Sequence, residues 1–320
     1  MSFPAHINKD EAEQTVGQHC RNVAEISRNH LRRLNLADTA YLAGLLHDAG
    51  KCTDEFRNYL EKASHGEVVH RGSIVHTFAA VRFLLNTYHS TPGFMTDPIK
   101  DLTVEILSSA IGGHHGLFDC FGEDGNCGFT HRMNKQPAYD DMAMDNFLEE
   151  ISDKCSIDQL FLSSVKEISS IIKLIMTISG STDERCFYLS LLTRLITSAL
   201  IDADRSDTYS FMNNEEHKEG KTLTLGILEA LTENFNSRLS ELECVTQIQA
   251  ARSELSDLCF QAASNSGGVF RLNLPTGAGK TLSGLRYALK HAEKFGKERI
   301  FFISPLLSIL EQNALEMRKA

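Results

Sequence analysis

The chain has 320 residues, of which 42% are hydrophobic and 23% are charged. This composition is ordinary for a globular protein and excludes a disordered chain, collagen and fibrous repeats. Acidic residues outnumber basic ones by 42 to 32, which gives a formal net charge of -10. A broad basic surface for nucleic acid is therefore excluded, so any polyanion site is local or built around cations. The 13 histidines are unusual and favour metal binding or acid–base chemistry.

Apolar residues at helical spacing dominate the first two thirds of the chain. A helix is predicted at 10–34, and a second follows the N-cap candidate Asp38 and ends at Gly50. No alternating strand pattern precedes residue 265, so the sequence predicts an all-helical domain. The further predicted helices are 76–88, 102–111, 142–152, 157–179 and 183–202.

The composition also predicts the domain organisation. Residues 1–205 form the helical domain, and the polar stretch 206–222 is predicted as a linker. Residues 223–265 are predicted as connecting helices. Residues 266–320 change to a strand, glycine-rich turn, helix and strand, which is a βαβ unit of a parallel sheet. Two strands cannot cover both faces of such a sheet, so this α/β segment is incomplete.

The sequence favours a cytoplasmic location. Its first fifteen residues lack a basic region followed by an apolar stretch, so no secretory signal is predicted. The most apolar segment, 168–180, contains Lys173 and is too short to span a bilayer. We therefore expect a buried helix there and no membrane partner.

The central motif is LLHDAGK at 45–51, which places His47 next to Asp48 on an apolar helix. Adjacent helical residues point about 100° apart. The pair therefore serves two metal ions only if Asp48 bridges them and His47 binds one. Further ligands have to come from other helices. The candidates are His19, His76, His114, His115 and Asp204.

Each candidate also has an ordinary structural interpretation. A core histidine such as His19 or His76 is more often a hydrogen-bonded structural residue. His114 and His115 follow two glycines and fit a surface loop, and Asp204 fits an ion pair. The combination of all these residues, in this order within one domain, favours a metal site over coincidence.

The pattern H…HDxGK…H…HH…D resembles the HD-domain metal phosphohydrolases. The segments IGGHHG and SALIDADRSDT make the whole chain similar to the CRISPR-associated helicase-nucleases of type I systems. This resemblance implies an all-helical HD fold and a metal-dependent nuclease, endo- or exonucleolytic, that cleaves single-stranded DNA in CRISPR interference. It also implies a CRISPR RNA-guided surveillance complex as a partner.

The resemblance further implies two divalent transition ions and assigns their ligands. The first ion is expected to be bound by His19, His47, Asp48 and Asp204. The second is expected to be bound by His76, His114, His115 and the bridging Asp48. Ligation rich in imidazole favours Mn, Fe, Co or Ni over Mg.

Asp48 and Lys51 are the expected catalytic residues. Lys51 lies one turn after Asp48 and is placed to meet the scissile phosphate as a point charge. The alternative interpretation is an exposed lysine that interacts with the helix dipole.

Two ligand positions have alternatives. The DAD segment offers Asp202 as well as Asp204, and Asp204 is preferred because Ala-Asp before a basic residue resembles the family form. His70 precedes His76 by six residues. His76 is preferred because the following Thr and Ala resemble the family's His-Ser/Thr-x-Ala pattern.

The segment LPTGAGKT at 274–281 lies between the predicted strands 269–274 and 299–304. It resembles the PTGxGKT motif of superfamily 2 helicases, which implies a RecA-like segment and, in the full-length helicase, ATP with Mg²⁺. Backbone amides and the helix dipole surround phosphates in such a loop. The expected ATP-binding residues are Thr276, Gly277, Gly279, Lys280 and Thr281.

Two other classes of function stay open. One is an HD phosphohydrolase that acts on nucleotides or cyclic nucleotides, and the fused PTGAGKT unit argues against it. The other is a non-catalytic regulatory fragment that docks on a surveillance complex. Metal content separates the second class from a nuclease.

Overall fold

The computed structural model describes residues 2–70, 74–91, 96–116, 127–134, 140–151, 154–215, 223–241, 244–275 and 277–319. The chain divides into two compact units, Met1–His217 and Lys218–Ala320. Each unit has its own internal packing.

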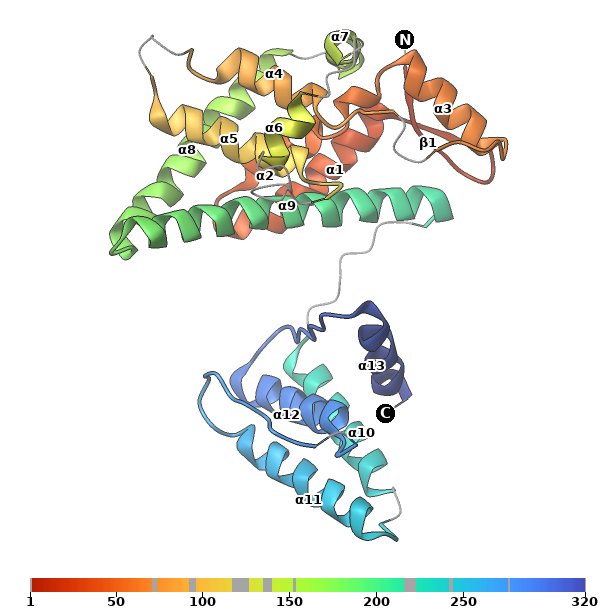
Figure 1. The fold of residues 1–320 in the computed structure, drawn as a ribbon, viewed down its shortest axis with the longest axis vertical. Coiled ribbons are helices and arrows are strands. Elements are labelled where there is room, and N and C mark those ends of the chain that lie inside the picture. Colours follow the sequence, from red (N-terminus) through yellow and green to blue (C-terminus); the bar gives the residue numbers. More distant parts are fainter. Residues whose placement is uncertain are drawn as a thin grey trace. The chain divides into compact units, whose positions relative to one another are not determined.

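The first unit is a helical domain with one small hairpin (Figure 1). The hairpin pairs β1 (Pro4–Ile7) with β2 (Glu13–Thr15) in antiparallel fashion. The helices between residues 16 and 112 are α1 (Val16–Leu31), η1 (Arg32–Leu34), α2 (Ala37–Leu46), η2 (Ala49–Lys51), α3 (Asp54–Ser64), α4 (Ala79–Tyr88) and α5 (Pro98–Gly112). The later helices are α6 (Gly128–Met133), α7 (Asp140–Ile151), α8 (Lys154–Ile178) and α9 (Thr182–Asn213).

The mainly α fold class is confirmed, with a correction at the N-terminus. Residues 10–15, predicted as helix, belong to the hairpin and its turn. Thr15 begins α1 with a capping box, in which its side chain accepts a bond from the Gln18 amide and the Gln18 side chain accepts one from the Thr15 amide. Strands of three and four residues are too short to display an alternating pattern, so the sequence did not reveal them.

Helix α2 lies at the centre of the first unit and packs against α1, α5, α8 and α9. Most residues of α2 are small or apolar, and most of them are buried. Gly44 allows α1 to approach closely, because a Cβ added there would lie 2.6 Å from the Ala24 Cα. This close contact fixes α2 and the residues that follow it against α1.

The N-terminus of α2 differs from the prediction. Asp38 lies in the first turn, and the N-cap position is Leu36, which provides no side-chain cap. Glu167 from α8 replaces the cap: its carboxylate accepts bonds from the amides of Asp38 at 3.0 Å and Thr39 at 2.8 Å. A capping group 129 residues away is invisible to a local sequence pattern.

Helix α9 runs along one side of the helices that precede it (Figure 1). It continues beyond the predicted end at 202 to Asn213, so the first part of the predicted linker 206–222 is helical. Asp207 lies in this part and is buried against α1, which explains the extension. Within the described residues, α9 is also the one helix long and apolar enough to cross a membrane, a test that core helices of soluble proteins pass as well.

The second unit contains α10 (Leu225–Ser240), α11 (Gln247–Ala262), α12 (Lys280–Phe295) and α13 (Leu307–Lys319). Helix α12 packs against the other three. The segments predicted as strands, 269–274 and 299–304, carry no strand hydrogen bonding in the structure. A lone pair of parallel strands lacks the neighbours that stabilise a sheet, which accounts for the difference.

We predict that Gly44→Ala destabilises the first unit by about 1–3 kcal/mol, because the new methyl group meets the backbone of α1. Thermal unfolding in the presence of a chelator measures the change. The matched control is Gly226→Ala, a helical position with open space around it, which is expected to lose no stability. Equal stability of Gly44→Ala and the parent protein would contradict the close packing of α1 on α2.

Candidate metal centre

The chain leaves the helical conformation between His47 and Asp48. Helix α2 ends at Leu46, His47 follows as its C-cap, and Asp48 has φ -114° and ψ 17°. The prediction that both residues lie within one helix is therefore wrong at Asp48. The turn directs the Asp48 carboxylate into the interior, where it is 1% exposed.

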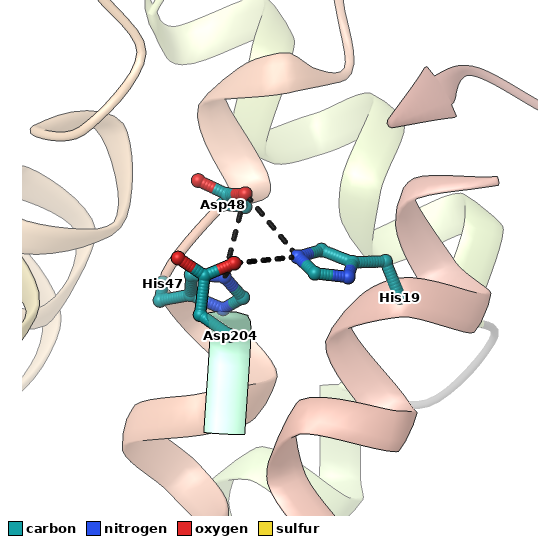
Figure 2. Close-up of side chains that lie close together, drawn as sticks. All are labelled: His19, His47, Asp48 and Asp204. Carbon is teal, nitrogen blue, oxygen red and sulfur yellow. Dashed lines mark ion pairs between the residues drawn. The ribbon is translucent and has the colours of Figure 1, made fainter. Parts of the chain in front are cut away.

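Four side chains from three helical segments converge around one oxygen of Asp48 (Figure 2). Asp48 Oδ2 lies 3.3 Å from His47 Nε2 and 3.5 Å from His19 Nε2. Asp204 Oδ1, from α9, lies 3.3 Å from His19 Nε2 and 3.8 Å from His47 Nε2. These four residues form the first group.

A second group surrounds the other oxygen of the same carboxylate. Asp48 Oδ1 lies 3.6 Å from His114 Nε2 and 3.8 Å from His76 Nε2. His115 Nε2 lies 2.9 Å from His76 Nε2. The structure thus brings all seven predicted residues together around Asp48. The first group has the four members that the resemblance implied, whereas the atoms of Asp48, His76 and His115 form the second group and His114 lies beside it, 3.6 Å from Asp48 Oδ1.

The groups fit a metal centre because several of their inward-facing polar atoms lack a hydrogen-bond partner. Among the described residues, the Nε2 atoms of His19, His47 and His114 and the Oδ1 atom of Asp48 are buried without a hydrogen bond. Buried polar atoms are nearly always hydrogen-bonded. Metal–ligand bonds of about 2.1 Å separate neighbouring ligand atoms by about 3.0–3.4 Å. The spacing within the first group, 3.3–3.8 Å, is close to that range.

The electrostatics of the groups agree with a cation site. Burial alone would lower the pKa of His19, but the carboxylates of Asp204, Asp207 and Asp48 outweigh it and raise the pKa to about 10. Burial would raise the pKa of Asp48, but Lys51 and the surrounding imidazoles hold it well below its usual range. The site therefore attracts positive charge, and metal binding would displace protons from it.

In the second group, the pKa values of His76 and His115 are lowered, whereas that of His19 in the first group is raised. Burial lowers the pKa of His76 to about 4, and burial together with His114 lowers the pKa of His115 to about 3. Both imidazoles are neutral at pH 7, which is the form that binds a metal ion.

Lys51 is buried beside the first group. Its Nζ lies 2.7 Å from Asp48 Oδ2. The interpretation as an exposed lysine at a helix end is therefore wrong, because Lys51 is 7% exposed. The ammonium group neutralises part of the buried negative charge.

The alternatives for two ligand positions lie elsewhere. The Asp202 side chain is 69% exposed and forms an ion pair with His30 at 3.0 Å. His70 is exposed, whereas His76 is half-buried and faces Asp48. The geometry favours Asp204 and His76.

Two residues at the site were missed by the sequence analysis. Asp207 Oδ2 accepts a hydrogen bond from His19 Nδ1 at 2.7 Å. Asp207 is three residues after Asp204, so both lie on one face of a helix. This signal was overlooked because residues 206–222 were interpreted as a linker. His6 from β1 packs its ring edge-on against His19 at 4.7 Å. No sequence pattern connected the hairpin with the site.

Four of the five predicted ATP-binding residues lie at the start of α12 or just before it, in the second unit. Gly279 is its N-cap, and Gly277 and Gly279 have φ of 84° and 81°, a conformation that favours glycine. Lys280 is exposed, and Thr281 Oγ1 donates to Asn313 Oδ1 at 3.1 Å. Thr276 lies outside the described residues.

Comparisons with known families agree with this division of the chain. Residues 16–138 match the family model described as HD domain, and residues 234–320 match the model described as type III restriction enzyme, res subunit. No curated protein matches the chain. The HD match includes six of the seven predicted ligands and ends before α9, which supplies Asp204.

Helix α9 contributes Asp204 to the first group. The chain carries an HD metal-dependent hydrolase domain followed in sequence by a helicase-like segment.

Proposed function

We propose that the HD domain is a metal-dependent nuclease that cleaves single-stranded DNA, and that it acts in type I CRISPR interference beside an RNA-guided surveillance complex in the cytoplasm. The observation that carries the reaction type is the pair of ligand groups on opposite oxygens of Asp48. The helicase-like segment supports DNA as the substrate, because helicases deliver single strands. The resemblance of the sequence motifs supports the CRISPR role.

The first group would hold one divalent ion and the second group another, with Asp48 shared between them. Two bound ions would supply a nucleophilic water at neutral pH and stabilise charge on the phosphodiester oxygens. The histidine-rich second group favours Mn, Fe, Co or Ni. Metal charge also explains how an acidic chain can accept a polyanion.

Lys51 is the second residue that we expect to act on the substrate. Its Nζ forms an ion pair with Asp48 Oδ2 at 2.7 Å. A metal ion bound to that carboxylate would compete for its charge, and Lys51 would then be able to pair with a substrate phosphate.

We predict that Asp48→Ala abolishes both metal binding and cleavage, because it removes the ligand shared by the two groups. Circular single-stranded DNA is incubated with Mn²⁺, Co²⁺ or Ni²⁺, and metal content is measured in parallel. Asp202→Ala, an exposed carboxylate on α9, is the control and should behave as the parent protein. Strong, chelator-sensitive cleavage by Asp48→Ala would exclude this centre. Activity of the parent protein on nucleotides but not on DNA would favour the nucleotide phosphohydrolase instead.

We predict that Lys51→Ala keeps its bound metal and slows cleavage about 10²-fold, because the lysine touches substrate phosphate and not the ion. Single-turnover cleavage and metal content are measured on the same preparation. Loss of metal from Lys51→Ala would show that the lysine instead maintains the ligand geometry.

We predict that the 320-residue polypeptide releases no phosphate from ATP and leaves duplex DNA intact. Residues 282–320, which follow the phosphate loop in this polypeptide, contain no Asp-Glu pair, and ATP hydrolysis needs an acidic residue that holds Mg²⁺ beside the loop. Phosphate release and duplex degradation are followed after ATP and Mg²⁺ are added, with Lys280→Ala as the control. ATP turnover that Lys280→Ala removes would contradict the prediction.

A further inference from the structure

The histidines of the metal centre share one mode of attachment. His19, His47, His76 and His114 each use Nδ1 to bond to a fixed acceptor and direct Nε2 towards Asp48. For three of them the acceptor is a backbone carbonyl: Gly44 for His47 at 2.7 Å, Ile111 for His114 at 2.6 Å and Ile74 for His76 at 3.1 Å. A carbonyl oxygen only accepts, so Nδ1 carries the proton and Nε2 is the nitrogen that faces Asp48.

His19 differs because its acceptor is a carboxylate. Its Nδ1 lies 2.7 Å from Asp207 Oδ2, and the imidazole is fully buried. A carboxylate that accepts from the distal nitrogen of a metal-binding histidine fixes the tautomer and also makes the ligand more basic. A backbone carbonyl also fixes the tautomer, but it makes the histidine less basic than a carboxylate does.

Asp207 is itself held in place on both oxygens. Gln14 Nε2 donates to Oδ2 at 2.8 Å, and Asn22 Nδ2 donates to Oδ1 at 2.8 Å. These donors come from β2 and α1, so two elements align the carboxylate with His19. Because both oxygens are engaged, Asp207 does not turn into the first group as a ligand of its own.

We propose that Asp207 is a positioning residue for the first metal ion, acting through His19, and that Gln14 and Asn22 hold it for this role. The proposal rests on the metal binding proposed above. It assigns the two carboxylates of α9 different tasks: Asp204 faces the ion and Asp207 orients a ligand. The hairpin acquires a role in metal affinity through Gln14.

The test uses Asp207→Asn in the full chain. Asparagine keeps the shape of the carboxyl group, and the amide of Asn22 can turn to pair with it, so folding is expected to persist. The expected result is metal affinity weakened about 10–100-fold, measured by titration of the metal-free protein with Mn²⁺. Unfolding in a chelator is measured in parallel, and the variant has to remain folded at the temperature of the titration, so that weaker Mn²⁺ binding is not a loss of folded protein. Asp202→Asn, an exposed carboxylate on the same helix, is the matched control and should keep the parent affinity.

Affinity of Asp207→Asn within twofold of the parent protein overturns the proposal, as does an equal loss in Asp202→Asn. If Asp207→Asn does not fold, Asn22→Ala removes one donor to the carboxylate, and unchanged Mn²⁺ affinity in that variant also overturns it. A wrong assignment of nuclease activity gives a different result, because the parent protein would then bind Mn²⁺ without cleaving DNA. The comparison of Mn²⁺ affinities would still decide the role of Asp207.

Discussion

The structure of the HD domain depends on the burial of one charged carboxylate. Asp48 is 1% exposed, and an isolated buried charge costs several kcal/mol unless opposite charge and polar groups surround it. Lys51 and four imidazoles meet this requirement. Each of them comes from a different part of the chain or from the turn beside Asp48, so the helices have to converge at this point.

Close backbone contacts make that convergence possible. A Cβ added to Gly50 would lie 1.9 Å from the His76 carbonyl oxygen, so the turn after Asp48 touches the backbone of His76 directly. The contact brings His76 beside Asp48. The Nδ1 bonds of the histidines then hold the rings in place before any ion binds. Little side-chain freedom remains to be lost on metal binding, which favours high affinity.

The sequence predicted the helices and the residues that gather around Asp48 well, and it predicted the connections between elements poorly. Periodicity reveals which residues face a core, so the helices around His19 and His114 were found. Contacts between distant residues leave no local pattern: the Glu167 cap of α2 and the hairpin beside His19 were missed. Asp207 was missed for another reason. It lies in a polar stretch that resembles a linker, and only its burial shows that the helix continues.

The position of Asp204 and Asp207 near the end of α9 has a consequence for synthesis on the ribosome. The bond between His19 and Asp207 joins residues 188 positions apart. Loops of that length close late, and an N-terminal domain folds as a unit while the chain is still growing. A nascent chain that already contains the five histidines of the centre lacks Asp204, which completes the first group, and Asp207, which contacts His19. The domain acquires its full set of potential ligands only when α9 has emerged, so unfinished chains do not carry a complete metal centre.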